Sequence, residues 1–467
     1  MYMGKESLKI VTIGGGSSYT PELIEGYIVR KDELPIREIV LVDIEEGREK
    51  LEIVGEMAKR MVKAAGLDWK VTLTLDRFEA LKDADYVTTQ FRVGLLDARV
   101  KDERIPLSHG VLGQETNGAG GMFKAFRTIP IILDLIEDMK KQCPDAWLVN
   151  FTNPAGMVTE AAIKHGGWER TLGLCNVPIV HKKINQTVEK AEEGELFYHF
   201  AGINHFHWHK VYDKDGNEVT QRIIDTLYNP NSEHKGDVEN IFGAAFHYEQ
   251  LKDLAMLPCA YHRYYYIEDE MLEHSIKEFE AGETRAQVVK ATEKRLFELY
   301  KDPALDYKPE ELTQRGGTYY SDAACEIIAS IQNDKHTEMV VSAKNNGAIT
   351  DLPYDSAVEV SGVVTAKGFV PYNWGSFENP AARGMLQVMK AMEETTIRAA
   401  ITGDYGAALQ AFTMNPLVPA GKTAKTLLDQ LLYAHKEHLP QFADKIAEIE
   451  ADQPEDVKYI DELMKSN

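Results

Sequence analysis

Residues 8–16 read LKIVTIGGG, and this stretch decides the fold class. A run rich in aliphatic and β-branched side chains ends in three consecutive glycines, Gly14 to Gly16. Such a run favours a buried β-strand, and glycines at its end permit a tight turn with close backbone approach. A helical pattern follows from Pro21 to Arg30. The start of the chain is therefore predicted to form a strand, a glycine turn and a helix.

The same alternation of apolar runs and helical patterns continues to about residue 190. Further strands are expected at residues 38–44, 70–76, 85–91, 146–152 and 170–175, and further helices at 45–65, 123–140 and 154–165. Continuous apolar strands separated by helices are typical of a parallel sheet that helices cover on both faces. Because crossovers between parallel strands are right-handed, the pattern predicts a doubly wound, Rossmann-type α/β fold.

The second part of the chain has a mixed pattern. A long loop is expected from Ile203 to Tyr261. Helices are expected at residues 281–301 and 380–403 and as a pair within 427–450, and strand-like runs occupy 338–342 and 357–365. A length of 467 residues also favours two domains. We expect a Rossmann-type domain at residues 1–195 and an α+β domain of the lactate-dehydrogenase-like C-terminal kind at residues 196–467.

Composition and charge restrict the possible partners and location. A net charge of −22 argues against a nucleic-acid partner, which requires a basic surface. The N-terminus lacks the features of a signal peptide, and no apolar run reaches the roughly 18 residues of a membrane span. The four cysteines are far apart and form no CxxC pair, which argues against a disulfide framework or a structural zinc site. We expect a cytoplasmic protein.

The ends of the first two strands predict a dinucleotide site. The candidate cofactor-binding residues are Gly14, Gly15, Gly16, Ser17 and Asp43. Backbone amides at a glycine turn and a helix N-terminus bind a pyrophosphate, and a carboxylate at the end of the second strand accepts hydrogen bonds from a ribose diol. The match is imperfect, because Tyr19 replaces the third glycine of GxGxxG. Asp43 would repel a ribose phosphate, so NAD is preferred to NADP.

The remaining strand ends carry polar side chains. In a doubly wound sheet the ligand lies beyond the carboxyl ends of the strands, so 88–92, 150–153 and 175–176 are expected to border one crevice. Cys175 ends the sixth strand. A free cysteine usually packs in a protein core as a small apolar residue. For Cys175, this interpretation and a chemical role are equally open.

Eight motifs carry a resemblance to a known family. In chain order they are IGGGSSYTPEL (13–23), GLLDARVKDERIPLSHGVLGQETNGAGG (94–121), NFTNPAG (150–156), GLCNVP (173–178), GINHFHW (202–208), PCAYHRYYY (258–266), LTQRGGTYYSDAA (312–324) and NNGAITDLP (345–353). Their content and order resemble glycoside hydrolase family 4. Within that family, the Cys-Asn-Val-Pro form is similar to that of members acting on 6-phospho-β-glucosides.

The resemblance implies a glycosidase that uses NAD and a divalent metal, Mn²⁺ in this family. Oxidation at sugar C3 acidifies the C2 proton, a base removes it, and the aglycone leaves C1. Water then adds at C1 and C3 is reduced again, so the cofactor is recycled within each turnover. The implied substrate is a phosphorylated disaccharide such as cellobiose 6-phosphate or an aryl glucoside 6-phosphate, and one product is glucose 6-phosphate.

The resemblance also assigns the metal ligands and the base. Cys175 and His205 would bind the metal, although ligand softness alone favours zinc or iron. His205, His207 and His209 alternate, which is compatible with an exposed polar strand face or a metal cluster, but among them His205 alone matches the motif. Tyr261 would be the base and Glu115 would help it through a proton relay, because a free tyrosine is a weak base at neutral pH.

Four residues are expected to contact the substrate: Arg99, Asn153, Asn176 and Arg285. Arginine suits a sugar phosphate because it donates two parallel hydrogen bonds, although a surface ion pair remains the alternative for both arginines. Asn153 is open to a second interpretation as a helix N-cap. Asn176 cannot protonate a leaving group as an aspartate would, so the acid is not identified.

Other functions remain open on the sequence. An α-linked or non-phosphorylated glycoside is the alternative within the family. An NAD-dependent hydroxy-acid dehydrogenase would share the sheet, but it would release NADH stoichiometrically and need no thiolate–imidazole metal site. A non-catalytic NAD-binding sensor would need neither Tyr261 nor the arginines. By family likeness we expect a homodimer or homotetramer.

Overall fold

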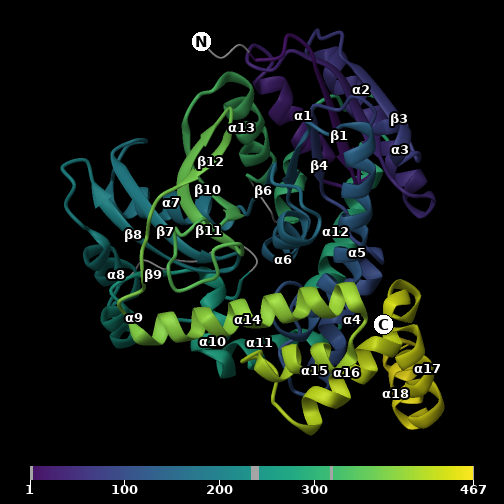
Figure 1. The fold of residues 1–467 in the computed structure, drawn as a ribbon, viewed down its shortest axis with the longest axis vertical. Coiled ribbons are helices and arrows are strands. Elements are labelled where there is room, and N and C mark those ends of the chain that lie inside the picture. Colours follow the sequence, from purple (N-terminus) through teal and green to yellow (C-terminus); the bar gives the residue numbers. More distant parts are fainter. Residues whose placement is uncertain (1–3, 233–240, 316–318, 466–467) are drawn as a thin grey trace.

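The computed structural model describes residues 4–232, 241–315 and 319–465. Within these residues nine strands form the main sheet, in the order β12-β11-β10-β6-β5-β4-β1-β2-β3 (Figure 1). The parallel strands are β1 (Leu8–Ile13), β2 (Ile36–Val42), β3 (Lys70–Thr74), β4 (Tyr86–Thr89), β5 (Trp147–Asn150) and β6 (Thr171–Gly173). Their order, 3-2-1-4-5-6, is that of a Rossmann fold, so the predicted α/β class is confirmed.

Helices cover both faces of the parallel strands. The elements of this part are α1 (Thr20–Val29), η1 (Glu45–Gly47), α2 (Arg48–Ala64), α3 (Arg77–Ala80), α4 (Leu95–Ser108), α5 (Gly118–Gln142), α6 (Ala155–Glu160), η2 (Ala161–His165) and α7 (Val177–Glu189). Alternate residues of β1 enter two separate apolar cores: Ile10 lies with residues of α1 and α2, whereas Val11 lies with residues of α5. Burial on both faces explains why β1 is an apolar run rather than an alternating pattern.

Three strands from the second half of the chain extend the same sheet. They are β10 (Thr337–Lys344), β11 (Ala357–Thr365) and β12 (Gly368–Pro371), and all pair antiparallel. The strand-like runs expected at 338–342 and 357–365 are strands. Ser342 of β10 pairs with Gly173 of β6, so these strands extend the main sheet and do not form a separate one. The main sheet therefore includes chain from both sides of residue 196, and the domain boundary there stays a prediction.

A second sheet lies beside the first and carries part of the site. It consists of β7 (Leu196–Ile203), β8 (Phe206–Asp213) and β9 (Leu257–Pro258) (Figure 1). The segment 203–261 was expected to be one long loop, and this is wrong: it contains β8, β9, α8 (Thr220–Tyr228) and α9 (Tyr248–Leu254), while 233–240 lie outside the described residues. The reason is that β8 is buried on both faces, so its polar and aromatic residues give no amphipathic signal.

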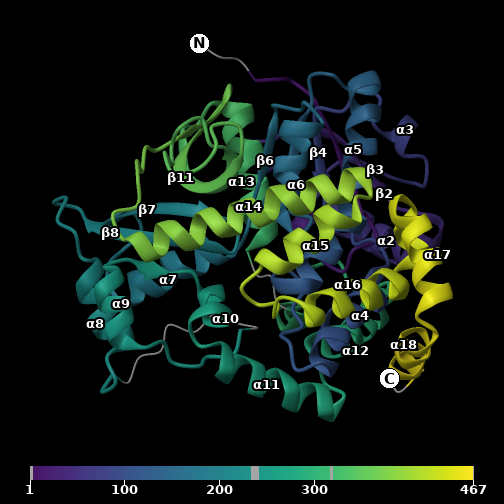
Figure 2. The same cartoon turned by 60° about the horizontal axis from the view of Figure 1, so that its bottom comes forward.

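The remaining elements of the described residues are helices. They are η3 (Ala260–His262), α10 (Arg263–Tyr266), α11 (Glu268–Ala281), α12 (Arg285–Tyr300), η4 (Glu310–Arg315), α13 (Tyr320–Asn333), α14 (Pro380–Thr402), α15 (Tyr405–Met414), α16 (Lys422–Ala434), η5 (Lys436–His438), η6 (Pro440–Phe442), α17 (Ala443–Asp452) and α18 (Pro454–Lys465). Figure 2 shows α14 running from the second sheet toward α5 and α15. The motif at 312–324 includes 316–318, which lie outside the described residues.

The helix expected at residues 281–301 begins later than predicted. It is α12, which starts at Arg285, whereas Ala281 is the last residue of α11. Gly282 has a φ of +72°, and Thr284 caps α12 reciprocally with Gln287. A left-handed glycine followed by a capping box ends one helix and starts another. No helix in the described part of the chain combines the length and apolar character needed to cross a membrane.

Candidate active site

The glycine turn lies at the carboxyl end of β1, against the end of β2. The backbone N–H groups of Gly14 and Gly15 donate to the carbonyl oxygen of Val42 at 2.9 and 2.8 Å. Gly14 has a φ of +84°, and a Cβ on Gly15 would lie 2.7 Å from the Cβ of Leu41. Glycine is therefore required both by the backbone conformation and by the approach to β2.

Asp43 faces this turn from the end of β2. Its Oδ2 accepts a hydrogen bond from the N–H of Gly16 at 2.8 Å, and its Oδ1 accepts one from Ile44 at 2.9 Å. Burial raises the pKa of this carboxyl, and the two backbone donors act against the rise. Ser17 begins the turn into α1, where its N–H donates to Gly14. The structure thus gathers the five predicted cofactor-binding residues at one corner of the sheet.

Cys175 and His205 come from different parts of the chain and meet at one point. Cys175 follows β6, and His205 lies in the turn between β7 and β8 with a φ of +63°. The Sγ of Cys175 is 3.2 Å from Nε2 of His205, and both side chains are buried. Burial lowers the pKa of His205 to about 4, so its ring is neutral at pH 7. A neutral imidazole beside a thiol is a pair that can bind a metal ion.

Tyr261 lies directly on this pair. Its ring stacks on that of His205 with centroids 4.1 Å apart and planes inclined by 20°. Burial raises the pKa of the phenol well above its usual value, and the neighbouring Cys175 raises it further. Tyr264 packs in a buried cluster with Ile267 and Met271.

Glu115 is surrounded by cations. Its carboxylate contacts Nη1 of Arg92 at 2.5 Å, Nη1 of Arg99 at 2.6 Å and the ammonium group of Lys124. Burial alone would raise the pKa of Glu115, but these cations outweigh it and hold the pKa well below its usual range. Burial lowers the pKa of Lys124 to about 7, assisted by the charge of Arg92. Glu115 is therefore ionised at neutral pH, and Lys124 is the member of the group that titrates there.

Glu103 connects Arg99 to the start of α12. Its Oε1 accepts from Nε of Arg99 at 2.7 Å, and its Oε2 accepts from the backbone N–H of Ala286 at 2.7 Å. The neighbouring Arg285 donates from Nη2 to the carbonyl oxygen of Arg315 at 2.9 Å. The two predicted arginines are thus close enough for the charge of Arg99 to help burial lower the pKa of Arg285.

Sequence reasoning missed three cations of this region: Arg92, Lys124 and Arg315. Arg92 lies at the end of the fourth predicted strand, whereas Lys124 lies in the mostly apolar first half of α5 and gives no pattern. Arg315 lies over the ring of Tyr19 at 4.4 Å and 3.6 Å from Oε2 of Glu293. Ion-pair partners far apart in sequence cannot be found without the fold.

The two predicted asparagines lie at helix starts. Oδ1 of Asn153 accepts from the N–H of Ala155 at 3.3 Å, at the beginning of α6. Asn176 immediately precedes α7, with its Oδ1 3.9 Å from the sulfur of Cys175. Both side chains are partly exposed on the side of the carboxyl strand ends. The N-cap residue of α6 is Pro154, so the N-cap interpretation of Asn153 is wrong, and the hydrogen bond to Ala155 holds the Asn153 side chain just before the helix.

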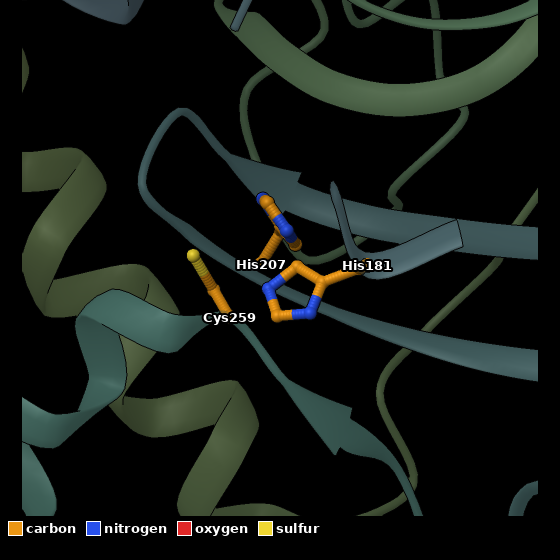
Figure 3. Close-up of side chains that lie close together, drawn as sticks. All are labelled: His181, His207 and Cys259. Carbon is orange, nitrogen blue, oxygen red and sulfur yellow. The ribbon is translucent and has the colours of Figure 1, made fainter. Parts of the chain in front are cut away.

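The other histidines of the INHFHWH segment are buried. His207 and His209 lie on β8 and have 0 % and 1 % exposure, so the interpretation as an exposed polar face is wrong. Nε2 of His209 lies 2.9 Å from Nδ2 of Asn185. His207 gathers instead with His181 and Cys259 (Figure 3).

Comparison with known proteins covers nearly the whole chain. Residues 9–190 match the model of the family 4 glycosyl hydrolases, and residues 200–418 match that of their C-terminal domain. A probable 6-phospho-beta-glucosidase of Bacillus subtilis is 54% identical, with 94% of this chain and 99% of that protein covered. A 6-phospho-beta-glucosidase of Escherichia coli is 46% identical, with 95% and 99% covered.

A solved structure agrees with these relatives. The 6-phospho-beta glucosidase of Thermotoga maritima, determined with manganese, NAD⁺ and glucose-6-phosphate, superposes with a TM-score of 0.82. It is 34% identical in sequence, and 92% of this chain and 99% of that chain are covered. Sequence and fold agree over the Rossmann part and over the part that follows it. The chain therefore belongs to family 4 of the glycoside hydrolases.

Proposed function

We propose that this protein hydrolyses 6-phospho-β-glucosides to glucose 6-phosphate and an aglycone, using NAD and a divalent metal ion, Mn²⁺. The observation that carries the proposal is the contact of Cys175, His205 and Tyr261 beside a buried group of cations. The thiol and imidazole suit a metal ion, the phenol suits a base, and the cations suit a phosphorylated sugar. The activities named for the relatives support the same reaction.

The residues present fit both cofactors. Asp43 and the start of α1 suit a ribose and a pyrophosphate, and side chains at the three glycines would collide with the ends of β2 and β4. The 3.2 Å between Sγ of Cys175 and Nε2 of His205 suits one ion, because ligands at about 2.0–2.3 Å from a metal lie roughly 3–4 Å apart. When bound, NAD⁺ supplies hydride transfer at sugar C3, and the ion polarises the oxygens on C2 and C3.

Tyr261 takes the proton from sugar C2. Its stacking on His205 holds the phenol oxygen next to the ion-binding pair, where a positive charge stabilises the phenolate against the effect of burial. Glu115 and Lys124 form the polar group beside it. The pKa of Glu115 is held low by its cations, so Lys124, with a pKa of about 7, exchanges protons near neutral pH while Glu115 fixes its position.

The cations around Glu103 and Glu115, of which Arg99 and Lys124 are buried, bind the sugar phosphate. Arg99 and Arg285 lie on either side of Glu103, and Arg92 and Arg315 add two more guanidinium groups. Together with Lys124 they exceed the nearby carboxylates of Glu103, Glu115 and Glu293, so the region retains positive charge in a protein of net charge −22. Bidentate hydrogen bonds from arginine suit a phosphate in such a site. Asn153 and Asn176 face the sugar from the strand ends.

We also propose that the protein forms a homodimer or homotetramer and that it is located in the cytoplasm. The four cysteines are free and buried, and a thiol that binds a catalytic metal has to stay reduced. Sedimentation of the purified chain measures its oligomeric state.

The test is hydrolysis of p-nitrophenyl β-glucoside 6-phosphate. After chelation, NAD⁺ and Mn²⁺ are each added or withheld, and the unphosphorylated and α-linked analogues run in parallel. The expected result is release of nitrophenol that requires both additions and leaves no net NADH. Activity that survives without NAD⁺ or metal contradicts the mechanism, whereas activity on another analogue alone retains the mechanism and changes the substrate.

A further inference from the structure

A second group of soft metal ligands lies beneath the candidate active site. His181 of α7, His207 of β8 and Cys259 after β9 each offer one ligand atom, and the three atoms lie within 4.8 Å of one another (Figure 3). All three side chains are buried, with exposures of 4 %, 0 % and 0 %. Two imidazoles and a thiolate are ligands that tetrahedral zinc prefers.

Glu359 of β11 orients this group. Its Oε1 lies 2.7 Å from Nδ1 of His207, and both side chains are completely buried. Its Oε2 accepts from Nδ2 of Asn204 at 2.9 Å, which fixes the carboxylate. A carboxylate on one ring nitrogen leaves the other, Nε2, free to bind a metal, which is the usual outer arrangement of metal-bound histidines.

His181 is held from another element. Its Nε2 accepts a hydrogen bond from the N–H of Ala260 at 3.2 Å, which fixes the ring beside the residue that follows Cys259. A metal ion bound at this nitrogen replaces that hydrogen bond, because the nitrogen has a single lone pair. The ring of His181 lies edge-on to that of His207, with centroids 6.2 Å apart.

The positions of these ligands along the chain parallel those of the candidate active site. His207 lies two residues after His205, Cys259 lies two residues before Tyr261, and His181 lies six residues after Cys175. An ion held by the second group would therefore tie together the three segments that carry the first. Closing the ligand atoms from 4.8 Å to the roughly 3.5 Å of a zinc site needs side-chain movements of about 1 Å.

We propose that His181, His207 and Cys259 bind a second, structural metal ion of the zinc type, distinct from the ion at Cys175 and His205. A water molecule completes its tetrahedron. The spacing of the cysteines alone argued against a structural zinc site, because a site with one cysteine and two histidines from separate elements has no CxxC signature. The ion fixes the position of Tyr261 and takes no part in the reaction.

Titration of the metal-free full-length chain with Co²⁺ tests this proposal. Co²⁺ bound to a thiolate has a charge-transfer absorption in the near ultraviolet, so each cysteine-containing site is counted separately from sites that lack sulfur. We expect about two thiolate-bound equivalents in the wild-type chain and about one in Cys175→Ala and in Cys259→Ala. Cys143→Ala is the matched control, because Cys143 is also buried but lies apart from both groups. It should retain both equivalents.

Zinc content measured by mass spectrometry gives a second readout. Zinc should remain in Cys175→Ala after mild chelation and be lost from Cys259→Ala. If Cys259→Ala does not fold, Glu359→Gln keeps all three ligands and should weaken zinc binding by about 10–100-fold. A wild-type chain that binds a single thiolate-bound Co²⁺, abolished by Cys175→Ala, overturns the proposal. This result is independent of the hydrolysis assay, so failure of the second site and failure of the proposed function are distinguishable.

Discussion

The ring of Tyr261 lies on that of His205, with centroids 4.1 Å apart and planes inclined by 20°. The candidate base and a candidate metal ligand are therefore in direct contact, although 56 positions separate them in the chain. The contact depends on β8 and β9, which pair through Trp208 and Pro258 and so bring the turn before β8 to the turn after β9. The phenol is held where a cation at His205 can lower its pKa.

Tyr261→Phe should keep this stacking while it removes the base. We expect kcat for the phosphorylated aryl glucoside to fall by about 10²–10⁴-fold, because positioned proton transfer contributes on that scale. Exchange of the sugar C2 proton with deuterated solvent should fall in parallel, as measured by NMR. Tyr264→Phe is the matched control on the adjacent helix and should retain activity within a few fold. A Tyr261→Phe enzyme that exchanges the C2 proton at the wild-type rate would show that another group is the base.

Cys175→Ser and His205→Gln should weaken metal binding at the candidate active site. Each removes one of the two protein ligands that lie 3.2 Å apart, so the remaining one binds the ion alone. We expect the Mn²⁺ concentration for half-maximal activity to rise by more than about 10-fold, with NAD affinity retained. Equilibrium dialysis with Mn²⁺ measures the first quantity and NAD titration the second. Unchanged Mn²⁺ affinity in both variants would place the catalytic ion elsewhere.

The part of the fold that could be predicted from sequence is the part whose strands are buried on both faces. β1 is a continuous apolar run ending in glycines, and the end of β2 is marked by Asp43, so both their type and their place were predictable. The first four residues of β8 are also buried, but they are aromatic residues alternating with His207 and His209. Buried histidines look like polar surface in a sequence, so their burial could not be predicted.

The site shows a similar division. Cys175 could be placed because it ends a strand, and parallel strands direct their carboxyl ends to one edge. Lys124 could not, because it is one lysine among apolar residues of α5, and its partner Glu115 comes from the loop before that helix. The relation between His181 and Cys259, 78 positions apart, also depends on the fold. Tertiary pairing of charges and ligands leaves no periodicity to detect.

Arg99→Lys and Arg285→Lys should raise KM for the phosphorylated substrate. Lysine keeps the charge but loses the planar pair of donors that matches a phosphate, so we expect a rise of about 10–100-fold with a smaller change in kcat. Arg295→Lys is the matched control, because Arg295 lies exposed on the same helix as Arg285. Initial rates over a range of substrate concentrations give both constants. If both variants keep the wild-type KM, the phosphate lies against other cations.

Asp43→Asn should narrow the preference for NAD⁺ over NADP⁺. The amide oxygen still accepts from Gly16 or Ile44, so the turn is retained, but the charge that repels a ribose phosphate is lost. We expect affinity for NAD⁺ to fall by about 10-fold and affinity for NADP⁺ to rise, as measured by calorimetric titration. Glu45→Gln removes an exposed carboxylate two positions away and should change neither. An unchanged ratio of the two affinities would remove Asp43 from the cofactor site.

Glu393→Gln should change how stability depends on pH. Glu393 is buried on α14 beside Lys390, and burial raises its pKa to about 7, with Lys390 opposing the rise and Glu160 adding to it. Between its usual pKa and pH 7 the folded state keeps a proton that the unfolded state has released, so the free energy of unfolding falls as pH rises through this window. Glutamine cannot ionise and lacks this fall.

The free energy of unfolding of Glu393→Gln, relative to wild type, should therefore rise by on the order of 3 kcal/mol between pH 4.5 and pH 7 and stay constant above. Urea unfolding at pH 5, 6, 7 and 8 measures the difference. Glu394→Gln, at the next position of α14 and paired with Lys164 near the surface, is the control for removing a carboxylate from this part of the helix. Lys390 keeps Glu160 as a partner in the variant, so its charge is not left unpaired. If the free energies of unfolding of Glu393→Gln and wild type depend on pH in the same way, Glu393 is ionised throughout this range.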